Sequence, residues 1–157
     1  MLAHRTRKRD CTPVAYHKPC DCECRKDIPQ NCSGWRKGVT IKGHTGKITR
    51  ALWGPVNRSI FSGSDDTTIR IWDWELFKEE RQLLGHGWDV KSADWHPFYS
   101  LVATGSMDNT AKLWDFKKGE LLHTFEGHSS TVWSVAVHPS GNFIATGSED
   151  KTWKLWR

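Results

Sequence analysis

Short hydrophobic runs recur along residues 38–157, and Gly, Asp, Asn or Pro residues bound them. Some runs alternate apolar and polar positions and others are continuous, and their many β-branched and aromatic residues predict strands. None extends with the 3.6-residue period of an amphipathic helix. The predicted strands are residues 47–53, 59–63 and 67–72, then 89–95, 101–105 and 110–114, then 131–137, 143–147 and 152–156, with outer strands at 38–42, 81–85 and 121–125. The pattern therefore predicts an all-β architecture.

The strand pattern repeats because the sequence itself repeats with an offset of 42 residues. The histidines of three Gly-His pairs, three turn aspartates and three closing tryptophans superpose without an insertion, namely His44, His86 and His128, Asp66, Asp108 and Asp150, and Trp72, Trp114 and Trp156. A period between about 20 and 50 residues marks a repeat array. Four short strands per period are typical of one propeller blade, and propellers have about four to eight blades. The chain is predicted to hold three blades of a partial β-propeller.

The motifs shared by the three copies resemble the WD40 repeat. They are the Gly-His pair, the turns "GSDD", "GSMD" and "GSED", and the endings "IWD" and "LWD". The resemblance covers residues 37–157 as copies 37–73, 79–115 and 121–157, and the third copy ends in Trp156-Arg157 in place of Trp-Asp. It implies WD40 β-propeller blades and a protein that binds other proteins.

The resemblance also implies a buried polar network in each blade, in which a His, a Ser or Thr, the turn Asp and the Trp are linked. Carried over by position, the twelve residues are His44, Ser62, Asp66 and Trp72, then His86, Thr104, Asp108 and Trp114, then His128, Thr146, Asp150 and Trp156. A buried carboxylate is tolerated only when hydrogen-bond donors fill its acceptor sites, which this residue set can provide. The residues that precede the turn aspartates, Asp65, Met107 and Glu149, are predicted to be exposed.

The same residue types could be taken for catalytic chemistry, with His44 and Asp66 as base and acid and Ser62 as nucleophile. A set that recurs three times at one spacing argues against this, because an active site is normally single. The sequence also has no Gly-rich phosphate loop, HExxH or GxSxG motif. We therefore predict a protein that is not an enzyme and needs no cofactor or metal.

The positive charge and the cysteines lie together in the N-terminal segment. The chain has 23 Lys and Arg against 18 Asp and Glu, and the excess falls within residues 1–38. All five cysteines lie at positions 11, 20, 22, 24 and 32. Residues 1–36 are predicted to form a basic, irregular extension with reduced thiols; a soft-metal site and disulfides are the alternatives. The basic run 4–9 is interpreted as a solvated terminus, with RNA, an anionic partner or an import receptor as alternative ligands.

Candidate partner-binding residues lie in and near the loops that follow the Gly-His pairs. They are Trp88, Asp89, Lys47 and Arg50. A tryptophan in a loop suits a contact anchor, and packing against the next blade is the alternative for Trp88. Trp153, which replaces Ile69 and Ala111 of the other copies, is predicted to fill space between blades.

Finer resemblances point to different complexes. Copy one, with "ALWGPVN", resembles the i-subunit family of eukaryotic translation initiation factor three and the related kinase-receptor-associated WD proteins. Copy two opens with "GHGWDVKSADWHP", similar to the WD-repeat subunit of the mRNA polyadenylation complex, and continues like a dynein assembly factor. We predict a cytoplasmic scaffold in a multiprotein complex, in translation initiation; a nuclear polyadenylation subunit with RNA contact and a dynein assembly factor are the alternatives. No apolar stretch approaches the ~20 residues of a membrane span.

The strand count predicts incomplete blades at both ends of the array. An outer strand at 38–42 precedes two complete blades, and the last blade stops after three strands. Exposed sheet edges and apolar faces favour association. Two hypotheses follow: the chain is a piece of a longer propeller, or two copies form a homodimer by exchanging the strand at 38–42.

Overall fold

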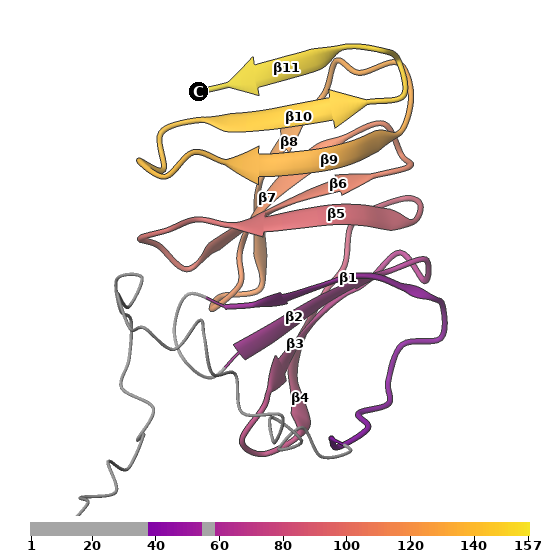
Figure 1. Ribbon diagram of the computed structural model, residues 1–157, viewed down its shortest axis with the longest axis vertical. Coiled ribbons are helices and arrows are strands. Elements are labelled where there is room, and N and C mark those ends of the chain that lie inside the picture. The colour runs from indigo at the N-terminus through magenta and orange to yellow at the C-terminus, as the bar shows by residue number, and fades with distance from the viewer. Residues whose placement is uncertain (1–37, 55–58) are drawn as a thin grey trace, which may run out of the picture. The chain divides into compact units, whose positions relative to one another are not determined.

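The computed structural model describes residues 38–54 and 59–157, which form three antiparallel sheets (Figure 1). Blade 1 consists of β1 (Ile48–Trp53), β2 (Ser59–Ser64), β3 (Ile69–Asp73) and β4 (Lys78–Leu83). Blade 2 consists of β5 (Val90–Trp95), β6 (Leu101–Ser106), β7 (Ala111–Asp115) and β8 (Glu120–Phe125). Blade 3 consists of β9 (Val132–Val137), β10 (Ile144–Ser148) and β11 (Trp153–Trp156). Each blade pairs its strands in chain order, so every connection within a blade is a hairpin.

The prediction of an all-β fold built from three propeller blades is confirmed. No helix among the described residues is long and apolar enough to cross a membrane. The predicted outer strand at 38–42 is wrong, because these residues adopt no strand conformation. Within residues 38–54 and 59–157, the outer strands of blades 1 and 2 each pair with the third strand of their own blade, β4 with β3 and β8 with β7, and residues 38–42 pair with no described strand.

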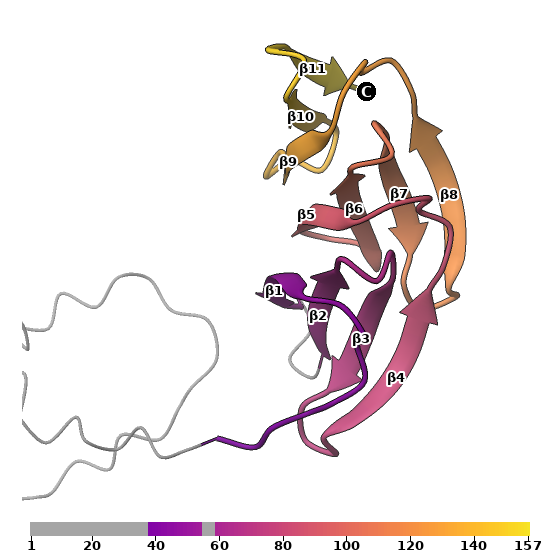
Figure 2. The ribbon, with the colours of Figure 1, turned by 90° about the vertical axis from the view of Figure 1, so that its right-hand side faces the viewer.

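The blades follow one another in chain order, and neighbouring blades pack face to face. Strands β1, β5 and β9 lie on one side of the stack, and β4 and β8 lie on the other (Figure 2). Side chains alternate along each strand, so each blade has one face toward the preceding blade and one toward the next. In β6, for example, Val102 packs with the blade 1 residues and Ala103 packs with those of blade 3.

The interface between blades 1 and 2 is the larger apolar core. Phe61, Ile69, Ile71 and Leu83 from blade 1 pack on residues of blade 2, which are Val90, Ala93, Val102, Trp114 and Phe116. The Trp95 ring lies between Phe61 and Phe116, with centroid distances of 5.4 and 4.8 Å. Burial of these side chains supplies most of the driving force that holds the two sheets together.

The interface between blades 2 and 3 combines smaller side chains with hydrogen bonds. Ala103 and Ala111 of blade 2 pack on Val132, Val135 and Ile144 of blade 3. The backbone N–H of Val135 donates to Ser92 Oγ at 3.1 Å, and that of Val137 donates to Asp94 Oδ2 at 2.8 Å. These two bonds fix the position of β9 along β5.

A buried histidine joins two turns across the same interface. His96 Nδ1 accepts hydrogen bonds from the backbone N–H groups of Phe98 and Tyr99, so Nε2 carries the proton and donates to the Gly141 carbonyl at 3.1 Å. Gly141 has φ of +76°, and a Cβ there would lie 2.3 Å from His96 Nε2. Only glycine fits this turn, because both the dihedral angle and the contact exclude a side chain.

Gly105 allows the close approach of blades 2 and 3, and its substitution provides a test of the packing. A Cβ at Gly105 would lie 2.8 Å from Val132 Cγ1 and 3.0 Å from the Val132 carbonyl oxygen, whereas at Gly147, the same position in blade 3, the nearest atom is Ser134 Cβ at 3.7 Å. We expect Gly105→Ala to lower the free energy of unfolding by about 1–3 kcal/mol through overpacking. Urea denaturation of Gly105→Ala beside Gly147→Ala measures the difference. Equal losses in the two variants would contradict this interface.

Candidate functional site

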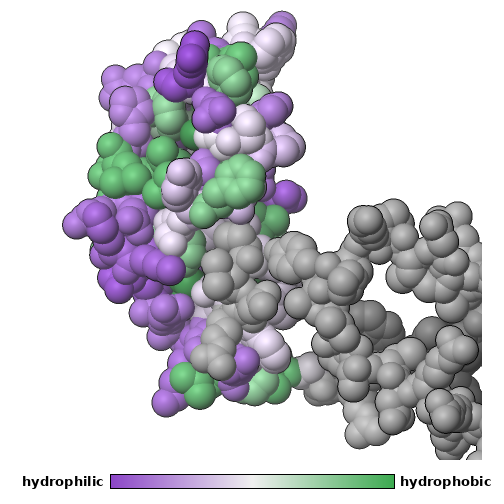
Figure 3. Space-filling view, turned by 90° about the vertical axis from the view of Figure 1, so that its left-hand side faces the viewer, coloured by the Kyte–Doolittle hydropathy of each residue, from purple (hydrophilic) through white to green (hydrophobic). Residues whose placement is uncertain are grey.

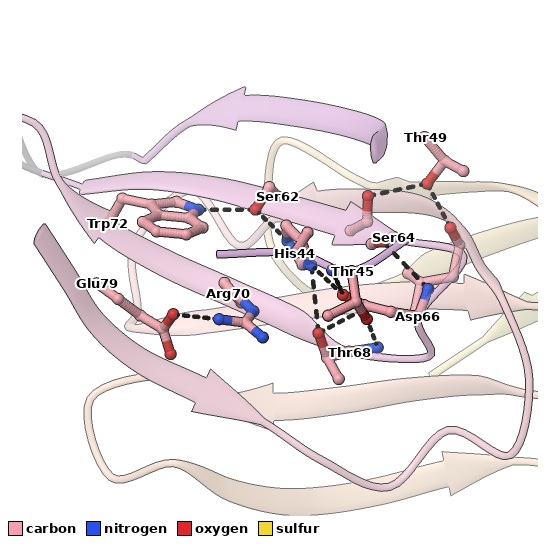
Figure 4. Close-up of polar contacts among 12 residues, drawn as sticks. His44, Thr45, Thr49, Ser62, Ser64, Asp66, Thr68, Arg70, Trp72 and Glu79 are labelled. Atoms are coloured by element: carbon pink, nitrogen blue, oxygen red, sulfur yellow. Dashed lines mark hydrogen bonds and ion pairs between the residues drawn. The ribbon is translucent and has the colours of Figure 1, made fainter. Parts of the chain in front are cut away.

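The tight turn between the second and third strands of each blade positions a carboxylate. The residue after each turn aspartate has a left-handed backbone, with φ of 69° at Thr67, 68° at Asn109 and 67° at Lys151. In all three blades, the backbone N–H of the aspartate donates a hydrogen bond of 3.1 Å to the hydroxyl of the serine two residues earlier. The turn thereby aims the carboxylate at the histidine of the Gly-His pair and at the backbone N–H of the residue after it, as Asp66 shows with His44 and Thr45 (Figure 4).

In every blade the structure brings the four predicted side chains into one hydrogen-bonded chain. In blade 2, the Trp114 indole N–H donates to Thr104 Oγ1 at 2.9 Å, Thr104 Oγ1 lies 2.8 Å from His86 Nε2, and His86 Nδ1 lies 2.7 Å from Asp108 Oδ2. The corresponding distances are 2.7, 2.7 and 2.8 Å in blade 1 and 2.9, 2.8 and 2.7 Å in blade 3. Blade 1 uses the Ser62 hydroxyl where the others use threonine.

The chemistry of its two ends fixes the direction of this chain. An indole N–H can only donate, and an ionised carboxylate can only accept. The hydroxyl of Thr104 therefore accepts from Trp114, and His86 Nδ1 carries a proton that it donates to Asp108. Because burial lowers the pKa of His86, the ring is neutral, and its Nε2 accepts the Thr104 hydroxyl. Each group in the chain is thus engaged by its neighbours, which satisfies polar atoms that are buried next to the apolar interface.

Each turn aspartate has further partners that the sequence interpretation missed. Oδ2 of Asp108 also accepts from the Gly87 N–H at 3.0 Å. Oδ1 accepts from the Thr110 hydroxyl at 2.6 Å and from its N–H at 3.0 Å. Thr68 and Thr152 make the same bonds in blades 1 and 3. The signal was present, since a threonine recurs two residues after each turn aspartate at the 42-residue offset.

Burial and hydrogen bonding set the protonation states of the central pair. Burial raises the pKa of Asp108, but the bonds from His86 and Thr110 outweigh it, so the pKa of this carboxyl lies well below its usual value. Burial lowers the pKa of His86, and this effect outweighs the Asp108 carboxylate, which raises it. The pKa of Asp66 is lowered in spite of burial, and that of Asp150 is lowered mainly by the Thr152 hydroxyl. Blade 2 therefore favours a neutral His86 and an ionised Asp108, and the other two blades favour ionised Asp66 and Asp150.

Acidification is expected to destabilise the fold in two stages. Both His86 and Asp108 bind fewer protons in the folded chain than in the unfolded chain, so the free energy of unfolding falls as pH falls. His86 contributes to the free energy of unfolding above pH 6.5, the ordinary pKa of histidine, and this contribution is lost as the pH falls below that value. Asp108 contributes above pH 3.8, the ordinary pKa of aspartate, and its contribution is lost as the pH falls further. Urea denaturation between neutral and acidic pH measures both stages, and Asp108→Asn should reduce the lower one, to which Asp66 and Asp150 also contribute. Stability that rises on acidification would contradict the assignment.

The candidate partner-binding residues lie outside the three networks. Trp88 is 63% exposed, so its side chain does not pack in the interface between blades. Lys47 and Arg50 are exposed, and Asp89 is half-buried. Trp153, predicted to fill space between blades, is 72% exposed, because this side of β11 faces away from blade 2; its role between blades stays a prediction.

An ion cluster bridges blades 1 and 2 near Trp88. Lys91 Nζ lies 2.7 Å from Asp65 Oδ1 and 2.8 Å from Asp89 Oδ2, and 5.9 Å from the centre of the Trp133 ring. The prediction that Asp65 is exposed is wrong, because its side chain is half-buried against Lys91; Met107 is half-buried too, and Glu149 is exposed. Asp65 was missed because its partner is specific to copy two: the other copies have Thr49 and Trp133 in place of Lys91.

The metal interpretation rests on residues outside this structure. Among residues 38–54 and 59–157, no group of three or more His, Cys, Asp or Glu side chains could hold a metal ion. The five cysteines and the basic run 4–9 lie outside the described residues, so the hypotheses on them stay predictions.

Comparison with known proteins matches the repeats to a single family. The WD40 family (WD domain, G-beta repeat) matches residues 35–73, 77–115 and 119–157. Nuclear distribution protein PAC1 of Coccidioides posadasii is 46% identical over 46 residues, and PAC1-1 of Uncinocarpus reesii and nudF of Aspergillus terreus are each 50% identical over 46 residues. Each match covers 29% of this chain, and the chain spans about a tenth of the length of these curated relatives.

Proposed function

Because the chain belongs to the WD40 repeat family, we propose that it is a non-catalytic scaffold that binds other proteins in a multiprotein complex. The main support is the threefold repetition of the polar network. The His, Asp and hydroxyl groups that could do acid–base or nucleophilic chemistry are bonded to one another in each blade. A substrate would have to displace bonds that hold the blade together, and the proposal calls for no cofactor.

The contact surface of the proposed scaffold includes the loop before β5. Trp88 exposes 63% of its surface there, and aromatic anchors of this kind are enriched among residues that dominate binding energy. Asp89 forms an ion pair with Lys91, so a carboxylate of fixed position follows the tryptophan in the loop. Lys47 and Arg50 add exposed positive charge from blade 1. A partner that offers an apolar pocket with an acidic rim would fit this combination.

The scaffold proposal is tested by affinity purification of the tagged chain from its own cells, followed by mass spectrometry. We expect co-purifying proteins with the parent chain and a selective loss of some of them with Trp88→Ala. Trp74→Ala, which changes another exposed tryptophan, is the matched control. An identical set of proteins with all three chains would contradict the role of Trp88. Turnover of a substrate that Asp108→Asn abolishes would contradict the non-catalytic assignment.

The same experiment separates the proposed pathways. Copy one supports translation initiation, copy two supports polyadenylation or dynein assembly, and the relatives named above are nuclear distribution proteins. None of these three relatives is named as an initiation factor. The proposal of translation initiation is therefore supported only by the resemblance of copy one. Recovery of initiation factor subunits, cleavage factor subunits, or proteins of nuclear distribution would assign the complex. A fluorescent tag tests the proposed cytoplasmic location against the nuclear alternative, and salt-dependent RNA binding that requires residues 1–36 would favour an RNA-contacting subunit.

A further inference from the structure

The stack of blades has an apolar sheet face exposed at each end. On blade 3, Trp153 and Leu155 of β11 are 72% and 58% exposed. Leu155 also lines a hollow of about 360 Å³, together with Ala136, Val137, Pro139, Phe143 and Ala145. On blade 1, Ile48 is 56% exposed beside a hollow of about 140 Å³, which is lined by Ile41, Ile48, Ala51, Ile60, Ser62 and Trp72. Exposed apolar surfaces of this kind mark interaction sites.

The flank between these two faces is different in character. Along the side that carries the β5–β6 and β9–β10 turns, hydrophobic groups are separated by hydrophilic ones (Figure 3). Its exposed aromatic residues, Phe98 and Tyr99, adjoin the His96 turn described above. The two sheet faces, which lie at opposite ends of the stack (Figure 1), are therefore the stronger candidates for a large apolar contact.

The chain itself shows what covers a face of each type. The blade 3 face has Trp153 and Leu155 where blade 2 has Ala111 and Leu113, and Ala111 is 1% exposed because blade 3 covers it. The blade 1 face has Ile48 where the other blades have Val90 and Val132. Both of these valines are fully buried against the preceding blade. One exposed face thus corresponds to the first half of an interface that the chain builds twice, and the other face corresponds to its second half.

The glycines of the second strand show an open position on blade 3. A Cβ at Gly63 would lie 2.9 Å from Val90, and one at Gly105 would lie 2.8 Å from Val132. At Gly147 the only nearby atom is Ser134 Cβ at 3.7 Å. A valine of the next blade thus fills the space above Gly63 and Gly105, and the same space above Gly147 is empty. Ile48 is the blade 1 counterpart of these two valines. In addition, Ser134 is the blade 3 counterpart of Ser92, whose hydroxyl accepts the Val135 N–H from the next blade.

We infer that the exposed face of blade 3 binds blade 1 of a second copy of this chain, head to tail, with Ile48 of that copy seated over Gly147. Both halves of the interface are present on one chain, so a single molecular species suffices. Two copies joined at both faces would bring together six blades, within the range of about four to eight that propellers adopt. A heterologous contact of this kind closes into a ring when its rotation allows. This self-association is separate from the binding of other proteins at Trp88, which lies in the loop before β5.

The oligomeric state of the full chain tests the inference. Light scattering over a concentration series is expected to give a mass of two copies for the parent chain. Gly147→Val puts a side chain into the open position and should weaken self-association about tenfold or more, because extra side-chain volume destabilises a close-packed contact. Gly87→Val is the matched control, because a Cβ at Gly87 meets only Asp108 Cβ at 3.7 Å in a loop away from both faces.

A complementation experiment separates loss of contact from loss of folding. Ile48→Arg disables the blade 1 face and Gly147→Val disables the blade 3 face, so each variant alone should be monomeric. An equimolar mixture retains one intact pair of faces and should form a one-to-one heterodimer. A parent chain that stays at the mass of one copy throughout the series overturns the inference. Self-association that Gly147→Val leaves unchanged, or variants that fail to combine although their circular dichroism matches the parent, also overturns it.

Discussion

Asp108→Ala is expected to lower the free energy of unfolding by about 3 kcal/mol, which is several times the cost of an ordinary surface substitution. The change removes the acceptor for His86 Nδ1, for the Gly87 N–H and for both donors of Thr110. His86 is only 6% exposed, so its Nδ1–H loses its acceptor in a mostly buried setting. Urea denaturation followed by tryptophan fluorescence measures the loss.

The control for this prediction is Glu120→Ala, which removes an exposed carboxylate of β8 in the same blade. It should change the free energy of unfolding by no more than about 0.5 kcal/mol. If Asp108→Ala unfolded at the same urea concentration as the parent chain, the hydrogen-bonded chain from Trp114 to Asp108 would not be a determinant of stability.

Trp114→Ala is expected to have an effect of about 3–5 kcal/mol, the range for loss of a buried aromatic side chain. Trp114 is 1% exposed and packs in the core between blades 1 and 2. Its removal leaves a cavity there and takes away the donor to Thr104 Oγ1. We expect the two blades to lose their cooperative unfolding as well, because this side chain contributes to the interface that couples them. Thermal unfolding monitored by circular dichroism measures both effects.

Trp88→Ala provides a matched comparison within blade 2. The same atoms are removed, but Trp88 is 63% exposed and its loss creates no cavity, so stability should change by no more than about 0.5 kcal/mol. Similar melting temperatures for the two tryptophan variants would contradict the assigned burial. The pair also separates the two uses of tryptophan in this chain, since Trp88→Ala is the variant expected to lose partners.

The sequence by itself determined the strands, the hairpin connections and the division into three blades. These features depend on local chemistry: alternating side chains select strands, Gly and Asp select tight turns, and the 42-residue offset repeats both. The WD40 resemblance further named twelve side chains, which the structure brings together in three hydrogen-bonded chains. Their positions could be named because each chain is closed within one blade and recurs unchanged.

Only the tertiary structure decided which side chains meet between the blades. Asp65 is half-buried because Lys91 reaches it from the next blade, and His96 anchors a turn of the blade after its own. Trp153 is exposed although its counterparts are buried, and residues 38–42 form no strand. In each case the outcome depends on which chain segment lies opposite, and a repeat pattern does not contain that information. Identical positions have different environments because a sheet face becomes a core only when a second sheet covers it.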